Sequence, residues 1–183
     1  MEDEKELLME MGVEEFVRRF KNNMDENEDS KFVFFLGAGC SVSSGIPDAG
    51  TLVRIWLPKL KGFKTGDERD YDDWARIQYP GYDGANASSF YGTIIEDLFL
   101  RPEERQREIE RLTERKDPSF GYAVLAQLMT HDKYGRHCNA VLTVNFDDLV
   151  ADALYLYTHK KPLIISHESL VGFVRTTRTR PLV

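Results

Sequence analysis

The fold is decided by residues 32–48, which read FVFFLGAGCSVSSGIPD. The first five are a continuous apolar run of β-favouring residues, and the glycines at 37 and 39 end it. Such a run is typical of a strand that is buried on both faces, as in a parallel sheet covered by helices. We therefore expect a buried strand that leads through a glycine-rich turn into a helix.

The glycine-rich turn is a candidate nucleotide site. Glycines let the backbone approach a ligand closely and adopt positive φ, and free N–H groups at a helix N-terminus favour a phosphate without any lysine. The ordinary dinucleotide fingerprint would need a third glycine where Val42 stands, and no Gly-Lys-Ser/Thr follows for a P-loop. A turn with no ligand also fits a bare G-x-G, but the longer string through Asp48 is more specific.

The rest of the chain alternates strands and helices, which predicts an α/β layered fold. We expect a second buried strand at 139–144, a third short strand at 163–165, and the opening of one more at 181–183. Five helices are expected. The first two have apolar stripes of Val13, Phe16, Val17 and Phe20, and of Leu52, Ile55, Trp56 and Leu60; the third, a charged helix over 101–116, has Pro102 in its first turn. The fourth follows a cap at 117–118 and carries Tyr122, Leu125, Leu128 and Met129, and the fifth follows a cap at Asp147 or Asp148 and carries Val150, Ala153, Leu154 and Tyr157. Residues 61–89 are rich in Gly, Asp, Tyr and Pro, which predicts loops and short helices.

Two strings resemble a known family. Residues 37–48 resemble the first NAD-binding motif of the sirtuin superfamily, G-A-G-x-S-x-x-x-G-I-P-D, and residues 143–147 (TVNFD) resemble its Thr-x-Asn-x-Asp motif. The resemblance covers 31–183, with 61–116 poorly matched, and 1–30 would form a separate amphipathic helix and acidic loop. It implies a Rossmann-like parallel sheet with helices on both faces, of the sirtuin or DHS-like NAD-binding kind.

The resemblance also implies roles for individual residues, with NAD+ as the substrate. The turn at 37–41 would hold the pyrophosphate, residues 46–48 would lie beside the nicotinamide and its ribose, and Asn145 would be catalytic. Asp147 could hold ribose or support the Asn145 loop, and it could equally be a plain helix cap. The full expected NAD+ site is Gly37, Ala38, Gly39, Ser41, Gly45, Ile46, Pro47, Asp48, Thr143, Asn145 and Asp147.

The chain departs from the protein deacylases of this family. Ala49-Gly50 stands where they carry Phe-Arg, and the only two cysteines, Cys40 and Cys138, cannot build their four-cysteine zinc module. We therefore expect no metal, and a helical insertion over 90–131 in place of the zinc module. These departures fit the sirtuin-like NAD hydrolases that bacteria use as antiphage effectors.

The family's His-Gly motif, which carries the general base, does not occur. His131 and His137 precede the Asn145 motif, and His159 falls at a helix end where a cation suits the dipole. His167 is the remaining candidate, although Glu168 follows it. The favoured explanation is that the chain is a fragment and that the catalytic histidine would follow residue 183, in which case these residues could keep the NAD site and lose most of the chemistry.

The expected function is hydrolysis of NAD+ to nicotinamide and ADP-ribose, as an antiphage effector. A module that senses NAD or ADP-ribose without turnover is the alternative; a deacylase and a domain serving assembly are less favoured, and cyclisation of NAD+ stays open. Expected partners are a homo-oligomer or a following sensor domain. The 183 residues carry a net charge of -7, which argues against nucleic acid binding. The sequence shows no secretory signal and no membrane-spanning run, so we expect a cytoplasmic protein.

Overall fold

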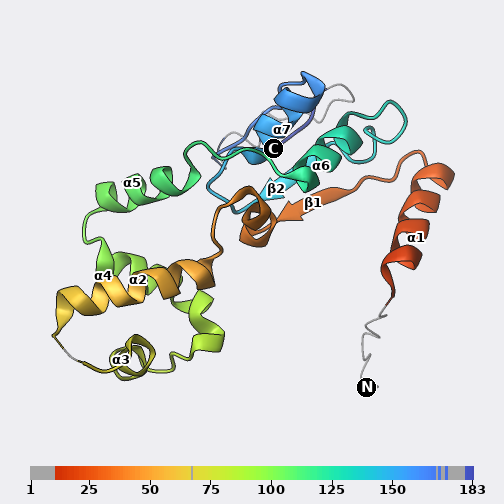
Figure 1. Cartoon of the computed structure of the whole chain (residues 1–183). Coiled ribbons are helices and arrows are strands. Elements are labelled where there is room, and N and C mark those ends of the chain that lie inside the picture. Colours follow the sequence, from red (N-terminus) through yellow and green to blue (C-terminus); the bar gives the residue numbers. More distant parts are fainter. Residues whose placement is uncertain (1–10, 67, 168, 170–171, 173–179) are drawn as a thin grey trace.

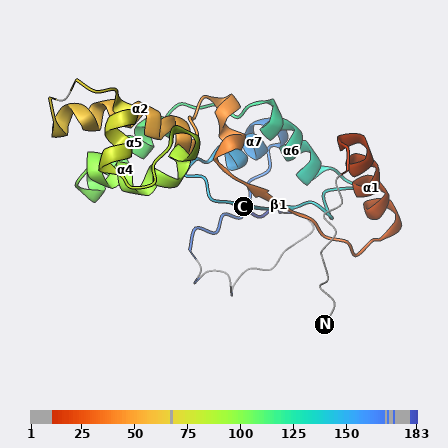
Figure 2. The same cartoon turned by 90° about the horizontal axis from the view of Figure 1, so that it is seen from below.

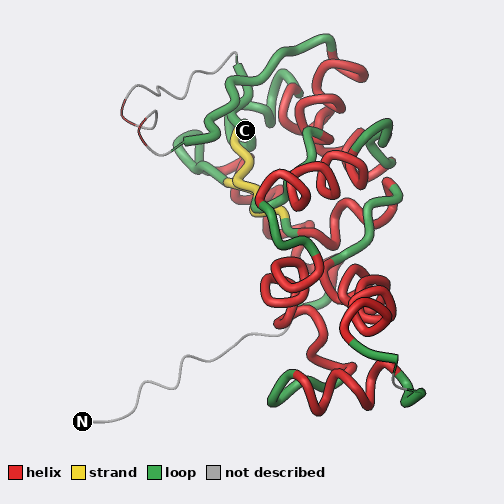
Figure 3. The backbone as a smooth tube through the Cα atoms, turned by 90° about the vertical axis from the view of Figure 1, so that its left-hand side faces the viewer, coloured by secondary structure: helices red, strands yellow, loops and turns green. Residues whose placement is uncertain are grey.

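The computed structural model describes residues 11–66, 68–167, 169, 172 and 180–183. It is a mixed α/β structure, mostly helical, with a small parallel sheet of two strands (Figures 1 and 3). The elements in chain order are α1 (Val13–Glu26), β1 (Val33–Leu36), the 3-10 helix η1 (Ala38–Ser44), α2 (Ala49–Lys64), α3 (Tyr71–Gln78), the 3-10 helix η2 (Gly84–Phe90), α4 (Tyr91–Leu98), α5 (Pro102–Thr113), α6 (Phe120–Thr130), β2 (Ala140–Thr143) and α7 (Leu149–Thr158).

The sheet confirms the predicted parallel pairing. β1 and β2 run side by side in a register that joins Val33 to Ala140 and Leu36 to Thr143. Leu182 extends the pairing, because it forms parallel bridges with Ala140 on one side and Leu163 on the other. The prediction of a third strand at 163–165 is wrong in extent, since Leu163 makes a single bridge there. Hydrogen bonding nevertheless lays 181–183 between β2 and the segment around Leu163.

Burial of the strands on both faces was predicted and is wrong. Phe34, Leu36 and Val141 pack into a core with α6 and α7, which lie together on one side of the sheet (Figure 2). The alternate residues face away from this core, so that Phe35 is 68% exposed and Leu142 58% exposed. Among the described residues, helices therefore cover one face of the sheet and leave an apolar face open.

The first helix forms where its periodicity predicts, but its apolar stripe is not buried. Val13 is 80% exposed and Phe16 55% exposed, and Met24 near the other end is the buried residue of α1. Phe20 packs edge-on against Phe32, with ring centroids 4.5 Å apart. The helix is thus fixed near its C-terminal half, next to the start of β1.

Much of the predicted insertion forms, together with α2, a helical unit with its own core, but the bounds 90–131 are wrong, because α6 packs with α7 and the sheet instead. Residues of α2, α3, η2 and α4 surround the fully buried Trp56, and side chains of α5 pack against them. Pro102 occupies the first position of α5, as predicted. Ile55 was expected in the α2 stripe and is instead 44% exposed, because Val53 and Leu57 take the buried positions beside Trp56.

Two details of the later helices differ from the prediction. Ser119, not residues 117–118, occupies the N-cap position of α6, which begins at Phe120. In α7, Leu149 is buried, whereas Tyr157 is 44% exposed and its hydroxyl donates to the Pro118 carbonyl. Across the described part of the chain, no helix combines the length and apolar character needed to traverse a lipid bilayer.

Candidate functional site

The two motifs meet at the carboxyl edge of the sheet. β1 ends at Leu36 and β2 at the paired Thr143, so the segments that follow both strands emerge side by side. The Val144 N–H donates to the Leu36 carbonyl at 3.3 Å. The Asn145 side chain then reaches across and donates from Nδ2 to the Gly37 carbonyl at 3.2 Å. Parallel pairing alone therefore brings together residues more than 100 positions apart.

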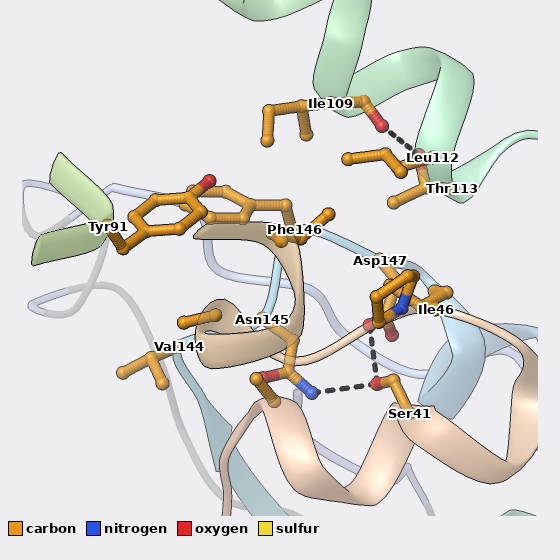
Figure 4. A pocket seen from close by; sticks show the side chains of 14 residues that line it. Ser41, Ile46, Tyr91, Ile109, Leu112, Thr113, Val144, Asn145, Phe146 and Asp147 are labelled. Carbon is orange, nitrogen blue, oxygen red and sulfur yellow. Dashed lines mark hydrogen bonds between the residues drawn. The ribbon is translucent and has the colours of Figure 1, made fainter. Parts of the chain in front are cut away.

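Ser41 is the centre of a buried hydrogen-bond network. Its side chain is 1% exposed, and its Oγ lies 2.7 Å from Asp147 Oδ2 and 3.0 Å from Asn145 Nδ2 (Figure 4). The Tyr122 hydroxyl lies 2.8 Å from the same Oγ. A hydroxyl offers one proton and two lone pairs. The amide Nδ2 can only donate and the ionised carboxylate can only accept, so Ser41 donates to Asp147. Its two lone pairs are then filled by Asn145 and Tyr122.

The orientation of the Asn145 amide follows from these contacts. Nδ2 has both protons engaged, one on the Gly37 carbonyl and one on Ser41 Oγ. A flipped amide would set Oδ1 against the Gly37 carbonyl, which can only accept, so the assignment is fixed by the network. Oδ1 is consequently left over, and it is the buried side-chain oxygen or nitrogen without a partner among the described residues. Buried polar atoms are normally paired, so this oxygen calls for a ligand or water.

Thr143 and Asp147 shape the loop that carries Asn145. Thr143 Oγ1 accepts a hydrogen bond from the Asn145 backbone N–H at 3.0 Å. Asp148 occupies the N-cap position of α7 without a side-chain cap hydrogen bond, whereas Asp147 Oδ1 accepts from the N–H of Leu149, the first residue of the helix, at 3.3 Å, and Oδ2 accepts from Ser41. Both carboxylate oxygens therefore have protein partners. Asp147 thus links the start of α7 to Ser41, which in turn contacts Asn145.

The glycine-rich turn continues as η1 rather than as a longer helix. Gly45, its C-cap, has φ of 81°, the left-handed conformation that favours glycine. Gly37 and Gly39 do not share it, and a Cβ added to either would meet no atom within 4 Å. Ala38 and Gly39 are exposed. The turn thus presents open space along its backbone, as a site for a large anionic ligand requires.

Residues 46–48 divide between two roles. Ile46 and Pro47 line a cavity beside Asn145. Asp48 instead caps α2, where its Oδ1 accepts from the Thr51 N–H at 2.7 Å, and this backbone hydrogen bond lowers the pKa of the carboxyl group. The expectation that Asp48 lies beside the nicotinamide gains no geometric support, since the described cavity lining does not include it.

The cavity measures about 280 Å³ and lies between the two parts of the molecule. One wall consists of residues of η1, the residues Ile46, Pro47 and Ala49, and the loop from Val144 to Asp147. The other wall comes from α2 and the helical insertion, and its side chains are mostly apolar: Leu52 of α2, and Tyr91, Ile109, Leu112 and Thr113 of the insertion (Figure 4). Sequence reasoning missed the four insertion residues, because 61–116 matches no motif, and it placed Leu52 only in a helix stripe. Tyr122 was also missed, since its helical spacing marked it only as core.

No histidine lines this cavity in the part of the chain that is described. His167, the candidate base, is exposed, and its Nδ1 lies 2.8 Å from Ser169 Oγ. His137 is buried with its Nδ1 2.8 Å from the Ser30 carbonyl, and His159 is the left-handed C-cap of α7, at the helix end where it was predicted. The described histidines therefore serve turns, caps and core contacts.

The chemistry of the site is that of a hydrogen-bond acceptor in an apolar cavity. Within the described residues, no three His, Cys, Asp or Glu side chains form a group that could hold a metal ion. A comparison with known protein families finds no match, and a search of curated protein sequences finds no significant match. The geometry and the two sequence motifs together are accordingly the basis for a functional proposal.

Proposed function

We propose that this protein binds NAD+ at the carboxyl edge of its sheet and hydrolyses it to nicotinamide and ADP-ribose. The observation that carries the proposal is Asn145 Oδ1, a buried acceptor with no protein partner, which belongs to a residue that lines the cavity next to the glycine-rich turn. In open parallel sheets, ligands bind outside the carboxyl ends of the strands. We also propose that the sheet belongs to a Rossmann-like fold. From the resemblance of the motifs, we propose that the protein acts as a bacterial antiphage effector.

The substrate would occupy two neighbouring regions. The cavity of about 280 Å³ suits one end of a dinucleotide, and its mostly apolar lining fits a planar nicotinamide ring. The pyrophosphate would follow the open backbone at Gly37 and Gly39, where no side chain intrudes. The nicotinamide ribose would then lie close to Asn145.

The reaction breaks the bond between nicotinamide and ribose. The pyridinium leaves as a neutral molecule, so the leaving group needs no acid, and the transition state has oxocarbenium character. Both Asn145 Nδ2 protons are already engaged, so Asn145 can act on the substrate only as an acceptor. Its Oδ1 would orient a ribose hydroxyl or the attacking water. The water oxygen would bond to the ribosyl carbon as the bond to nicotinamide breaks, and the water would release one proton to solvent to yield ADP-ribose.

A sensor that binds NAD or ADP-ribose without turnover is the second candidate, and a specific observation favours it. A carboxamide oxygen positions a proton donor but is no general base at neutral pH, and no described histidine lines the cavity. Under this alternative the same Oδ1 accepts a ribose hydroxyl of the bound ligand. The two candidates share the site and differ in whether nicotinamide is released.

The test compares wild type with Asn145→Ala. Nicotinamide release from NAD+ is followed by chromatography, and binding of NAD+ and of ADP-ribose by the shift in melting temperature. The control is Asn86→Ala, because Asn86 has its amide hydrogen-bonded in η2, away from the cavity. The hydrolase predicts release by wild type and the control, and a loss of at least ~10²-fold in a folded Asn145→Ala.

The outcomes separate the candidates. Saturable binding by wild type that Asn145→Ala weakens, without nicotinamide release, supports the sensor. Release that is unaffected in Asn145→Ala would contradict the role of this residue. Neither release nor binding of either ligand would overturn the assignment of this site to NAD+.

A further inference from the structure

Tyr122 belongs to the site although neither motif contains it. It lies on α6, 81 residues from Ser41 in sequence, and its hydroxyl is 2.8 Å from Ser41 Oγ. The side chain is 3% exposed and its ring packs in the core between α6, α7 and the sheet. The phenol therefore joins the core to Ser41, whose side chain contacts both Asn145 and Asp147.

The direction of the hydrogen bonds defines what Tyr122 does. Because the Ser41 proton is committed to Asp147, the bond between Tyr122 and Ser41 has the phenol as donor. Burial, together with the nearby Asp147 charge, raises the pKa of Tyr122, so the phenol keeps this proton at neutral pH. The Ser41 Oγ is then saturated, with one lone pair for Tyr122 and the other for Asn145 Nδ2.

We propose that Tyr122 is a positioning residue for Asn145, acting through Ser41. Its hydroxyl holds the Ser41 side chain in the rotamer that donates to Asp147 and accepts from Asn145. This arrangement engages both protons of the amide nitrogen and leaves Oδ1 as the atom of the Asn145 amide that has no protein partner. The geometric part of the inference stands on the network alone, and its consequence for turnover rests on the proposed function.

A purely structural role is the competing explanation, because the Tyr122 ring also fills the core. Tyr122→Phe keeps the ring and removes only the hydroxyl. The matched control is Tyr82→Phe, since Tyr82 is 4% exposed and its hydroxyl donates to Asp72 at 2.9 Å, far from the network. Both variants lose one buried phenol hydrogen bond, so they should lose similar amounts of stability.

Kinetics distinguish the two roles. We expect Tyr122→Phe to lower kcat for NAD+ about tenfold with little change in KM, and Tyr82→Phe to leave both unchanged. On a Ser41→Ala background, Tyr122→Phe should cause no further loss of kcat, because the intermediary is already gone. A loss that adds in full on this background would show that the hydroxyl does not act through Ser41, and would overturn the inference.

A second measurement does not depend on turnover. The Asn145 side-chain amide gives a pair of signals in a 15N–1H correlation spectrum, which Asn145→Ala identifies by their disappearance. We expect Tyr122→Phe to move these signals and Tyr82→Phe to leave them in place. Unmoved signals in Tyr122→Phe would refute the inference. If wild type releases no nicotinamide while the signals move, the proposed hydrolysis fails and the positioning role of Tyr122 holds.

Discussion

Replacing Ser41 by alanine is the most direct perturbation of the network, because it removes one oxygen that serves three partners. The Tyr122 hydroxyl and one Asn145 Nδ2 proton lose their acceptor, and Asp147 Oδ2 loses its donor. Asn145 keeps its bond to the Gly37 carbonyl, and Asp147 is only half-buried, so water can replace the lost donor there. The main cost therefore falls on the buried phenol.

The magnitude follows from this accounting. A buried polar group that is left without its partner costs about 1–3 kcal/mol, and the weaker losses at Asn145 and Asp147 bring the expected total to about 2–4 kcal/mol. In a chain of 183 residues this corresponds to a fall in Tm of roughly 5–15 °C. The mutation removes one oxygen from a side chain that is 1% exposed, so the cavity left behind is small.

The assay is equilibrium unfolding in urea, followed by circular dichroism, on wild type, Ser41→Ala and Ser43→Ala. Ser43 lies in the same 3-10 helix but is exposed, so its substitution should change the unfolding free energy by less than ~0.5 kcal/mol. A Ser41→Ala variant as stable as Ser43→Ala would refute the network, because the three hydrogen bonds could not then exist together in solution.

Two further predictions concern neighbouring positions. Gly45→Ala should destabilise the fold by about 1–2 kcal/mol, since φ is 81° there, and a Tm equal to that of Gly39→Ala would contradict this. Gly39→Ala should leave Tm unchanged and weaken NAD+ binding, because its Cβ would enter open space beside the turn, and an unchanged NAD+ affinity would contradict this. The pKa of Asp48 is lowered in the folded state by the Thr51 hydrogen bond, so its contribution to stability is present above the unfolded pKa and is lost as the pH falls below about 4. Asp48→Asn keeps an N-cap acceptor and should flatten this part of the pH dependence in urea titrations, and an unchanged slope would count against the cap.

The sequence predicted the meeting of the two motifs because parallel pairing fixes where strands end. Asn145 and Gly37 follow the paired ends of β2 and β1, so a correct assignment of two strands was enough to bring them together. Ser41 was expected near a phosphate, yet its Oγ is consumed by protein partners. Sequence spacing cannot reveal this, because the direction of a hydroxyl depends on a tyrosine 81 residues away.

The errors in the fold prediction have a common physical origin. A continuous apolar run such as residues 32–36 is compatible with burial on both faces, but burial is decided by what packs on each face. Here α6 and α7 cover one face, and Phe35 points away from them. In the same way, the apolar stripe of α1 was predicted from the helical spacing of its apolar residues. This spacing shows that a helix is amphipathic, but it does not show that another element packs on its apolar side.

The hydrogen-bond arithmetic at Asn145 finally separates binding from catalysis. Four polar groups of the network, from Ser41, Tyr122, Asp147 and Asn145 Nδ2, are engaged with one another. Among the described residues, Asn145 Oδ1 is the buried side-chain polar atom that has no partner and can receive a ligand proton. Such an oxygen can orient a ribose hydroxyl in a sensor and a water molecule in a hydrolase, since the hydroxyl and the water each need a hydrogen-bond acceptor. Hydrolysis adds one requirement, a group that takes the proton from water. Loss of NAD+ binding in Asn145→Ala therefore tests the site that the sensor and the hydrolase share. Nicotinamide release by wild type tests whether a group that takes the proton from water is present. Measuring both separates ligand binding from hydrolysis.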